Sequence, residues 1–368
     1  MKLIIIRSNL KKALEAVSKI SSENTNLPIL KNILLKTNGS SLVISATNLE
    51  LALSYTVSAK VIEPGETTIP ANIFYSIINN LNNEVINIEL EKDNIKIKTD
   101  NYEAVINTLP TEDFPIIPKI KGNSGFKINS EKLNLYLKKV LNATQFSDLR
   151  PEINGILFHF DGGDLKLVGT DSFRLAEKTV SGSEFESNIE QGFKEIIPLK
   201  TINELIKIFE EGVVEIYFDN NQISFKNEEV ELISRLIEGN FPEYDQIIPK
   251  EFEIEAILEK NEFLNAIKVT SILSGKVSEI KIKIVKGNKY LEINSLNQGV
   301  GENKYLVPAK IKGEEIEVDF NSNYILEGVK SFFKDEKILI SFNNSDKPTI
   351  LKSIGDVSYF YILMPIKK

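Results

Sequence analysis

The chain contains three copies of one pattern, and this internal repetition restricts its fold more than any other feature of the sequence. Residues 33–52 align without gaps on residues 156–175 at a shift of 123, with the apolar positions and the turn glycine coinciding. Residues 280–295 form a more divergent third copy. In each copy two alternating apolar runs flank a short turn, a pattern typical of a β-hairpin. With 368 residues, the chain is long enough for several domains, each with its own core.

Two further segments of each copy have apolar residues at helical spacing, one before the hairpin and one after it. The spacing predicts six short helices, at 8–20, 71–81, 130–141, 199–211, 261–269 and 322–334. We expect Ser8, Ser130 and Asn261 to cap three of these helices, and Pro70 and Pro198 to open two others.

The ends of the first two copies also match, since residues 109–115 resemble residues 236–242. Stretches containing proline and lysine follow, near 118–125 and 249–251, and are predicted to be linkers. The sequence therefore predicts an α+β fold of three tandem domains with antiparallel strands, because tight hairpins connect those strands. The predicted domains are 1–122, 123–248 and 249–368.

Residues suited to catalysis or metal binding are scarce. The chain has no cysteine, so it has neither disulfides nor thiolate sites. Its one histidine, His159, alternates with apolar residues in a predicted strand and completes no Ser/His/Asp set. The acidic stretch 161–164 with Asp171 lacks the ligand spacing of a calcium loop and falls where a hairpin turn is predicted. We therefore expect no catalytic residues, no metal and no cofactor.

The first residues contain four consecutive apolar side chains before Arg7, too few for a signal peptide or a membrane span. We therefore expect a cytoplasmic protein that does not enter a membrane. The net charge of −8 argues against indiscriminate coating of nucleic acid.

Charge is unevenly distributed along the chain. The six predicted helices together carry +4, so the remainder carries −12. In three helices, lysines recur at a spacing of seven, which returns to the same helix face. These are Lys12 and Lys19, Lys132 and Lys139, and Lys200 and Lys207. Either these faces are merely solvated, or they form a mildly basic surface that contacts phosphates independently of sequence.

Several motifs together resemble the bacterial sliding clamp, the β subunit of the replicative DNA polymerase. The resemblance covers essentially the whole chain and is carried by residues 27–35 (LPILKNILL), 47–50 (TNLE), 64–71 (PGETTIPA), 170–176 (TDSFRLA), 241–244 (FPEY) and 364–365 (MP). It implies a head-to-tail homodimer of three-domain chains that forms a ring, with helices lining the hole and sheets outside. It further implies a non-enzymatic processivity factor that encircles double-stranded DNA without sequence preference and acts at the nucleoid during replication.

The resemblance also implies a cleft for linear peptides of the replicative polymerase, the clamp loader and repair polymerases. The implied cleft residues are Ile153, Thr170, Ser172, Phe173, Arg174, Leu175, Pro242, Ile247, Asn321, Tyr324, Met364, Pro365 and Ile366. Leu175, Pro242, Ile247 and Met364 would offer an apolar, adaptable wall, although Leu175 and Ile247 would otherwise be read as ordinary core residues. The implied dimer contacts are Ile272 and Leu273, facing a strand near residues 104–106.

The sequence departs from the family pattern at several positions. Phe173 stands where a histidine is common, and Asn24, Asn72, Pro151 and Glu152 stand where basic or aromatic residues commonly face DNA. The alternative functions are a non-ring interaction scaffold of three domains and, less favoured by the composition, an enzyme.

Overall fold

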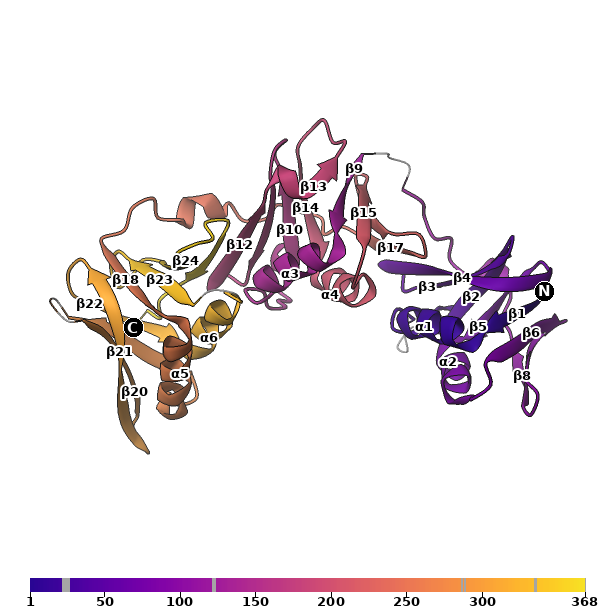
Figure 1. Cartoon of the computed structure of the whole chain (residues 1–368), viewed down its shortest axis with the longest axis horizontal. Coiled ribbons are helices and arrows are strands. Elements are labelled where there is room, and N and C mark those ends of the chain that lie inside the picture. The colour runs from indigo at the N-terminus through magenta and orange to yellow at the C-terminus, as the bar shows by residue number, and fades with distance from the viewer. Residues whose placement is uncertain (22–26, 121–123, 286, 288, 334–335, 368) are drawn as a thin grey trace. The chain divides into compact units, whose positions relative to one another are not determined.

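The computed structural model describes residues 1–21, 27–120, 124–285, 287, 289–333 and 336–367 (Figure 1). The chain divides into two compact units. Unit 1 comprises Met1–Ser130 and Asn203–Leu236, and unit 2 comprises Glu131–Ile202 and Ile237–Lys368. The described residues form six α-helices: α1 (Arg7–Ser18), α2 (Ala71–Asn80), α3 (Ser130–Leu141), α4 (Leu199–Ile208), α5 (Lys260–Thr270) and α6 (Ser322–Lys330).

Unit 1 is organised around antiparallel strands. Its main strand order is β9-β15-β16-β17-β4-β1-β6-β7-β8, and β2 pairs with both β3 and β5. The bounds are β1 (Lys2–Ile6), β2 (Asn32–Asn38), β3 (Ser41–Thr47), β4 (Leu51–Glu63), β5 (Glu66–Pro70), β6 (Val85–Glu91), β7 (Asn94–Lys98), β8 (Glu103–Asn107), β9 (Gly125–Asn129), β15 (Val213–Phe218), β16 (Gln222–Lys226) and β17 (Val230–Arg235). In this unit β17, from the second repeat, pairs with β4, from the first.

Unit 2 repeats this plan with the strand order β14-β10-β11-β12-β25-β24-β23-β18-β21-β20-β19-β22. Here β25, at the end of the third repeat, pairs with β12 of the second. The bounds are β10 (Gly155–Phe160), β11 (Leu165–Thr170), β12 (Arg174–Val180), β13 (Phe185–Ser187), β14 (Phe193–Pro198), β18 (Ile254–Glu259), β19 (Glu279–Ile284), β20 (Tyr290–Asn297), β21 (Gly301–Lys312), β22 (Ile316–Asn321), β23 (Lys337–Phe342), β24 (Thr349–Ser353) and β25 (Tyr359–Leu363).

The helices bury one apolar face each. In α1, Leu10, Ala13, Leu14 and Val17 are fully buried at the i, i+3, i+4, i+7 spacing of an amphipathic helix. This face packs on α2 and β4, while α5 packs on α6 and β21 in unit 2. The helix pairs α1/α2 and α5/α6 can be followed in Figure 1.

The predicted helix positions agree with the structure to within a few residues, but the predicted caps are wrong. Helix α1 begins at Arg7 and α5 begins at Lys260, so Ser8 and Asn261 lie inside the first turn, and Ser130 is the first residue of α3. Each of these helices directly continues a strand. Its first backbone N–H therefore finds a carbonyl on a neighbouring segment, at 2.8 Å from Arg7 N to Glu84 O, for example. This bond satisfies one of the four backbone N–H groups that the first turn of a helix leaves without an intrahelical partner.

Helices α2 and α4 likewise begin one residue after the prolines expected to open them, because Pro70 and Pro198 are the last residues of β5 and β14. The six helices, the repeated hairpins and the antiparallel pairing otherwise confirm the predicted α+β class. The last residue of the sixth predicted helix, Lys334, lies outside the described residues, as does Asn288 in the third hairpin turn.

Candidate functional site

Unit 2 has a tight corner between β11 and β12, formed by Thr170–Arg174 (the β11–β12 corner). The Thr170 hydroxyl donates to Arg174 O at 2.7 Å and accepts from Ser172 N at 3.1 Å. Asp171 Oδ1 accepts from the backbone N–H groups of Phe173 and Arg174 at 2.9 and 3.0 Å. Ser172 has a φ of +78°, a conformation stabilised here by the surrounding hydrogen bonds. Short polar side chains thus determine where β12 begins.

Arg174 is 6% exposed and anchors the corner to α6. Its Nε bonds Asp171 Oδ2 at 2.9 Å, its Nη1 contacts Glu327, and its guanidinium lies 4.4 Å from the ring centroid of Tyr324. Burial lowers the pKa of Arg174, but Tyr361, Glu327 and Asp171 raise it by more, so the net shift is upward. The guanidinium therefore stays charged and holds the corner in place.

A cleft of about 120 Å³ lies beside this corner. One wall is β25, whose register places Leu363 opposite Arg174 and Ile362 opposite Leu175. Just beyond β25, Met364 N bonds Phe173 O at 2.9 Å. The other wall is the 3₁₀-helix η5 (Tyr244–Ile247) and the residues before it. The cleft is lined by Arg150, Thr170, Ser172, Arg174, Leu175, Pro242, Glu243, Tyr244, Ile247, Ile362 and Met364.

Seven of the residues implied by the family resemblance therefore line one cleft. Six others lie outside its lining. Phe173 is 61% exposed and its ring stacks on Tyr324, with 6.5 Å between centroids. Asn321 caps α6 through Asn323 N. The remaining three are Ile153 and Pro365, both buried, and Ile366, whose backbone N–H bonds Asp319 O.

Four lining residues, Arg150, Glu243, Tyr244 and Ile362, were not among those predicted. Tyr244 and Glu243 belong to the FPEY motif, so this motif could have identified both as cleft residues. Arg150 reaches the cleft because its Nη1 donates to Ser172 Oγ at 2.7 Å, a contact between distant residues that no local pattern encodes.

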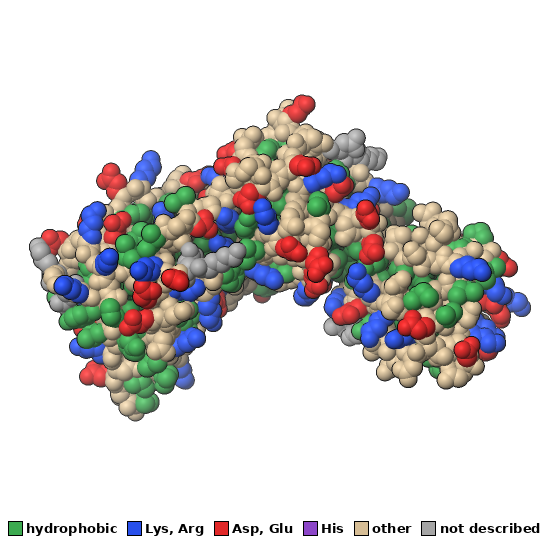
Figure 2. Space-filling model, viewed as in Figure 1, with side chains coloured by type: hydrophobic (Ala, Val, Ile, Leu, Met, Phe, Trp, Pro, Cys, Tyr) green, Lys and Arg blue, Asp and Glu red, His purple; other side chains and the backbone are tan. Residues whose placement is uncertain are grey.

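The lysines expected to form a basic surface differ in their surroundings. Five are exposed, and four of these lie within ion-pair distance of a carboxylate: Lys12 with Glu229 (3.6 Å), Lys19 with Glu15 (3.4 Å), Lys132 with Glu184 (3.6 Å) and Lys207 with Glu204 (2.8 Å). Within the described part of the chain, Lys200 is the exposed member of the set without such a carboxylate. Exposed ion pairs are weak, so a phosphate could replace the carboxylate beside each of the four paired lysines. Figure 2 shows basic and acidic side chains intermixed on the visible face of each unit.

The expectation that Lys139 lies on the exposed basic face is wrong. Lys139 is 8% exposed, with its Nζ 3.4 Å from Asp356 and 4.8 Å from the ring centroid of Tyr359. Its spacing from Lys132 does return to one helix face, but the β24–β25 turn covers that end of the face. Lys178 is also buried there, and burial lowers its pKa.

Asp356 joins these two buried lysines to the β24–β25 turn. Burial raises the pKa of Asp356, but hydrogen bonds from Ser358 and the charges of Lys178 and Lys139 lower it by more. The folded-state pKa therefore lies below the ordinary aspartate value, and the carboxylate form stabilises this part of unit 2.

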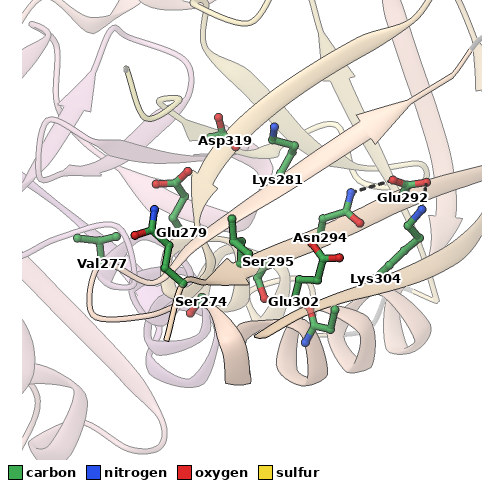
Figure 3. A pocket seen from close by; sticks show the side chains of 13 residues that line it. Ser274, Val277, Glu279, Lys281, Glu292, Asn294, Ser295, Glu302, Lys304 and Asp319 are labelled. Atoms are coloured by element: carbon green, nitrogen blue, oxygen red, sulfur yellow. Dashed lines mark hydrogen bonds and ion pairs between the residues drawn. The ribbon is translucent and has the colours of Figure 1, made fainter. Parts of the chain in front are cut away.

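The implied dimer contacts lie on the 3₁₀-helix η6 (Ser271–Leu273). Ile272 is 75% exposed and Leu273 is half-buried. Beside η6 lies an open cavity of about 690 Å³, drawn in Figure 3, with exposed Val277 and Leu296 on its lining and a Glu292–Lys304 ion pair at 3.5 Å. In unit 1, β8 is an edge strand on which Val105 is 62% exposed and Ala104 and Ile106 are half-buried. Both surfaces expose apolar side chains that a partner could cover.

The other candidate positions have ordinary surroundings. His159 is half-buried in β10, opposite Lys166 and Lys194, and residues 161–164 form the β10–β11 turn as predicted. Among the described residues, no three His, Asp or Glu side chains are grouped so as to hold a metal ion. Of the family departures, Asn72 and Pro151 are exposed, Glu152 pairs with Arg150 at 3.0 Å, and Asn24 lies outside the described residues. No described helix is long and apolar enough to cross a membrane.

Comparison with known proteins agrees with the repeat structure. Models of the N-terminal, central and C-terminal domains of the DNA polymerase III beta subunit match residues 1–118, 127–243 and 245–367. The chain is 28% identical to the beta sliding clamp of Pseudomonas aeruginosa over 100% of both chains. It is 27% identical to that of Staphylococcus aureus, over 95% of this chain and 94% of the relative.

A crystal structure of the DNA polymerase III subunit beta from Pseudomonas aeruginosa matches the fold with a TM-score of 0.94, at 28% identity and over 100% of both chains. The prediction of three tandem clamp-type domains is therefore confirmed, and the scaffold alternative is not supported. The chain belongs to the DNA polymerase III beta subunit family, and its function is that of a DNA sliding clamp.

Proposed function

We propose that two copies of this chain pair head to tail into a closed ring around duplex DNA and perform no chemistry of their own. The observation that carries the proposal is Ile272, which is 75% exposed on η6 beside other exposed apolar side chains. The edge strand β8, with Val105, offers an apolar surface of similar character in the first repeat. Six clamp-type domains would then surround the DNA, and topology rather than tight binding would retain it.

In such a ring the exposed lysines of α1, α3 and α4 would face the DNA. Lys200 would make the strongest phosphate contact, since each of the other four lysines would have to leave a nearby carboxylate to bind phosphate. Contacts of this kind are independent of sequence and weaken with salt. We place the protein in the bacterial cytoplasm, at the nucleoid during replication, and expect it to need no cofactor.

Sedimentation velocity and negative-stain images test the ring. A dimer of twice the 41.5 kDa chain mass with a central hole is expected at micromolar concentration. A strictly monomeric chain under these conditions would contradict the proposal.

We further propose that the cleft beside the β11–β12 corner binds short linear peptides of the replicative polymerase, the clamp loader and repair polymerases. Leu175, Ile362 and Ile247 supply apolar contacts, and Met364 can adjust to different anchors. Burying about 300 Å² of apolar peptide surface would contribute about 7 kcal/mol before ordering costs are subtracted. That magnitude suits partners that exchange.

The test uses fluorescence anisotropy with a short linear peptide from the replicative polymerase of the same organism. Ile247→Ala combined with Met364→Ala should weaken binding by about tenfold or more, the loss typical of truncating central apolar contacts. Val357→Ala is the matched control, because Val357 is 90% exposed and does not line the cleft. Equal affinity of the double variant and the control would rule out this cleft.

A further inference from the structure

The first repeat contains a second copy of the β11–β12 corner. In this β3–β4 corner, Thr47–Leu51, the Thr47 hydroxyl donates to Leu51 O at 3.1 Å and accepts from Leu49 N at 3.0 Å. Asn48 Oδ1 accepts from Glu50 N and Leu51 N at 3.1 and 2.8 Å. Leu49 has a φ of +76°, matching the +78° of its counterpart. The two backbones are therefore built alike.

The strand beside this corner is also repeated. In unit 1, β17 pairs with β4 and places Ile233 opposite Ala52, as β25 places Ile362 opposite Leu175 in unit 2. Arg235 N bonds Glu50 O at 2.9 Å, as Met364 N bonds the carbonyl of its own corner. Unit 1 thus repeats the corner and the neighbouring strand that border the cleft of unit 2.

The side chains at this second location are smaller or more polar. The shift of 123 pairs Ser45 with Val168 and Ser54 with Glu177, while the strand registers pair Glu231 with Phe360. Val168 belongs to the apolar cluster that fills this space in unit 2, and Phe360 packs against that cluster. Unit 1 instead has a cavity of about 270 Å³, room for about nine water molecules.

This cavity, the β4–β17 groove, has apolar walls and three charged lining residues, Glu66, Lys119 and Glu231. Its lining is Leu34, Ser45, Ser54, Glu66, Thr111, Phe114, Pro115, Ile116, Ile117, Pro118, Lys119, Glu231 and Ile233. Glu66 pairs with Lys36 at 2.7 Å. Glu231 accepts a hydrogen bond from Ser224 at 3.2 Å, and among the described residues no lysine or arginine lies within ion-pair distance of it. Lys119 is exposed in the segment after Pro118.

We propose that the β4–β17 groove is a second docking site, which takes a short peptide segment of a partner protein with an apolar side chain followed by lysine or arginine. The apolar side chain would occupy the space between Phe114, Ile117 and Ile233, where large side chains fill the equivalent space of unit 2. The basic side chain would meet Glu231. Such a peptide differs from one selected by the cleft of unit 2, where the corner itself carries a buried arginine.

The probe is an acetylated and amidated peptide, Gly-Val-Leu-Lys-Gly, with a second peptide carrying glutamate in place of lysine. Binding is followed by the methyl NMR signals of isoleucine in the full-length protein. Ile117 and Ile233 report on the groove, and Ile247 reports on the cleft of unit 2. Saturable shifts of Ile117 and Ile233 are expected, with a dissociation constant of about 1 mM or lower, equivalent to about 4 kcal/mol.

Two variants distinguish specific binding in the groove from nonspecific hydrophobic binding. Glu231→Lys should weaken the lysine peptide by about tenfold or more and should make the glutamate peptide the better ligand. Ser45→Val copies the second repeat and partly fills the cavity, so it should weaken both peptides. Absence of saturable shifts at Ile117 and Ile233, or equal affinities in wild type and Glu231→Lys, would overturn the proposal. Shifts at Ile247 alone would also overturn it and would leave the proposed cleft function intact.

Discussion

The buried ion pair of the β11–β12 corner can be replaced by residues that the protein itself uses in the equivalent corner of the first repeat. Asp171 and Arg174 are 8% and 6% exposed and bond each other at 2.9 Å. Their counterparts are Asn48 and Leu51. Arg174→Leu alone should leave Asp171 buried without its cation, and breaking such a pair costs about 3–5 kcal/mol.

Adding Asp171→Asn should recover much of this loss. An asparagine at position 171 can still accept the two backbone N–H groups of the corner, as Asn48 does at 2.8 and 3.1 Å. The double variant would remain somewhat less stable than wild type, because the contact of Arg174 with the Tyr324 ring, about 0.5–2 kcal/mol, is absent. Recovery of about 2 kcal/mol relative to Arg174→Leu is the expected result.

Differential scanning calorimetry measures both effects. Unit 2 has about 200 residues, and at this size 1 kcal/mol shifts Tm by about 2–4 °C. Arg174→Leu should therefore lower the Tm of unit 2 by about 6–20 °C. Glu327→Gln is the control, because Glu327 is 45% exposed and its loss should cost less than about 1 kcal/mol. A double variant no more stable than Arg174→Leu would refute the reasoning.

Three further changes have defined outcomes. Asp356→Asn should lower Tm at pH 7. Because the folded-state pKa of Asp356 is depressed, its carboxylate stabilises the fold above about pH 4, and this stabilisation is lost below it. The Tm difference from wild type should therefore close as the pH is lowered through this range. Gly328→Ala would place a Cβ 2.5 Å from the Tyr361 ring and should cost about 1–3 kcal/mol in urea unfolding, whereas Gly355→Ala, with nothing within 4 Å, should be tolerated. Ile272→Ala with Leu273→Ala should shift sedimentation toward the monomer, because the double change removes two apolar side chains from the proposed dimer interface.

Much of the fold could be predicted because the repeats encode it locally. Alternating and helical periodicities depend on neighbouring residues, so the hairpins and the six helices were placed correctly. The helix caps were predicted wrongly. The first N–H of α1, that of Arg7, bonds the carbonyl of Glu84, which is far away in sequence. The prediction that Lys139 is exposed was wrong for the same reason. Its helix face is set by local spacing, but its burial is set by Asp356 and Tyr359 in another repeat.

The cleft was predictable through its motifs and not through its chemistry. Thr170, Arg174 and Met364 come together because β25 pairs with β12, a pairing that periodicity does not specify. The resemblance supplied that information. Arg150 was missed because its contact with Ser172 joins residues far apart in sequence. The β4–β17 groove was missed because it depends on small or polar side chains at positions where the second repeat has larger ones.

The boundaries of the repeats and those of the compact units do not coincide, because β17 joins β4 and β25 joins β12. A fragment cut at the end of the second repeat would therefore lose the partner of β12 and expose the backbone donors and acceptors of an inner strand. Unprotected strand edges recruit other strands. Single repeats should therefore aggregate. A fragment of two consecutive repeats keeps one of the two pairings, β17 with β4 or β25 with β12, and leaves the strand of the other pairing without its partner.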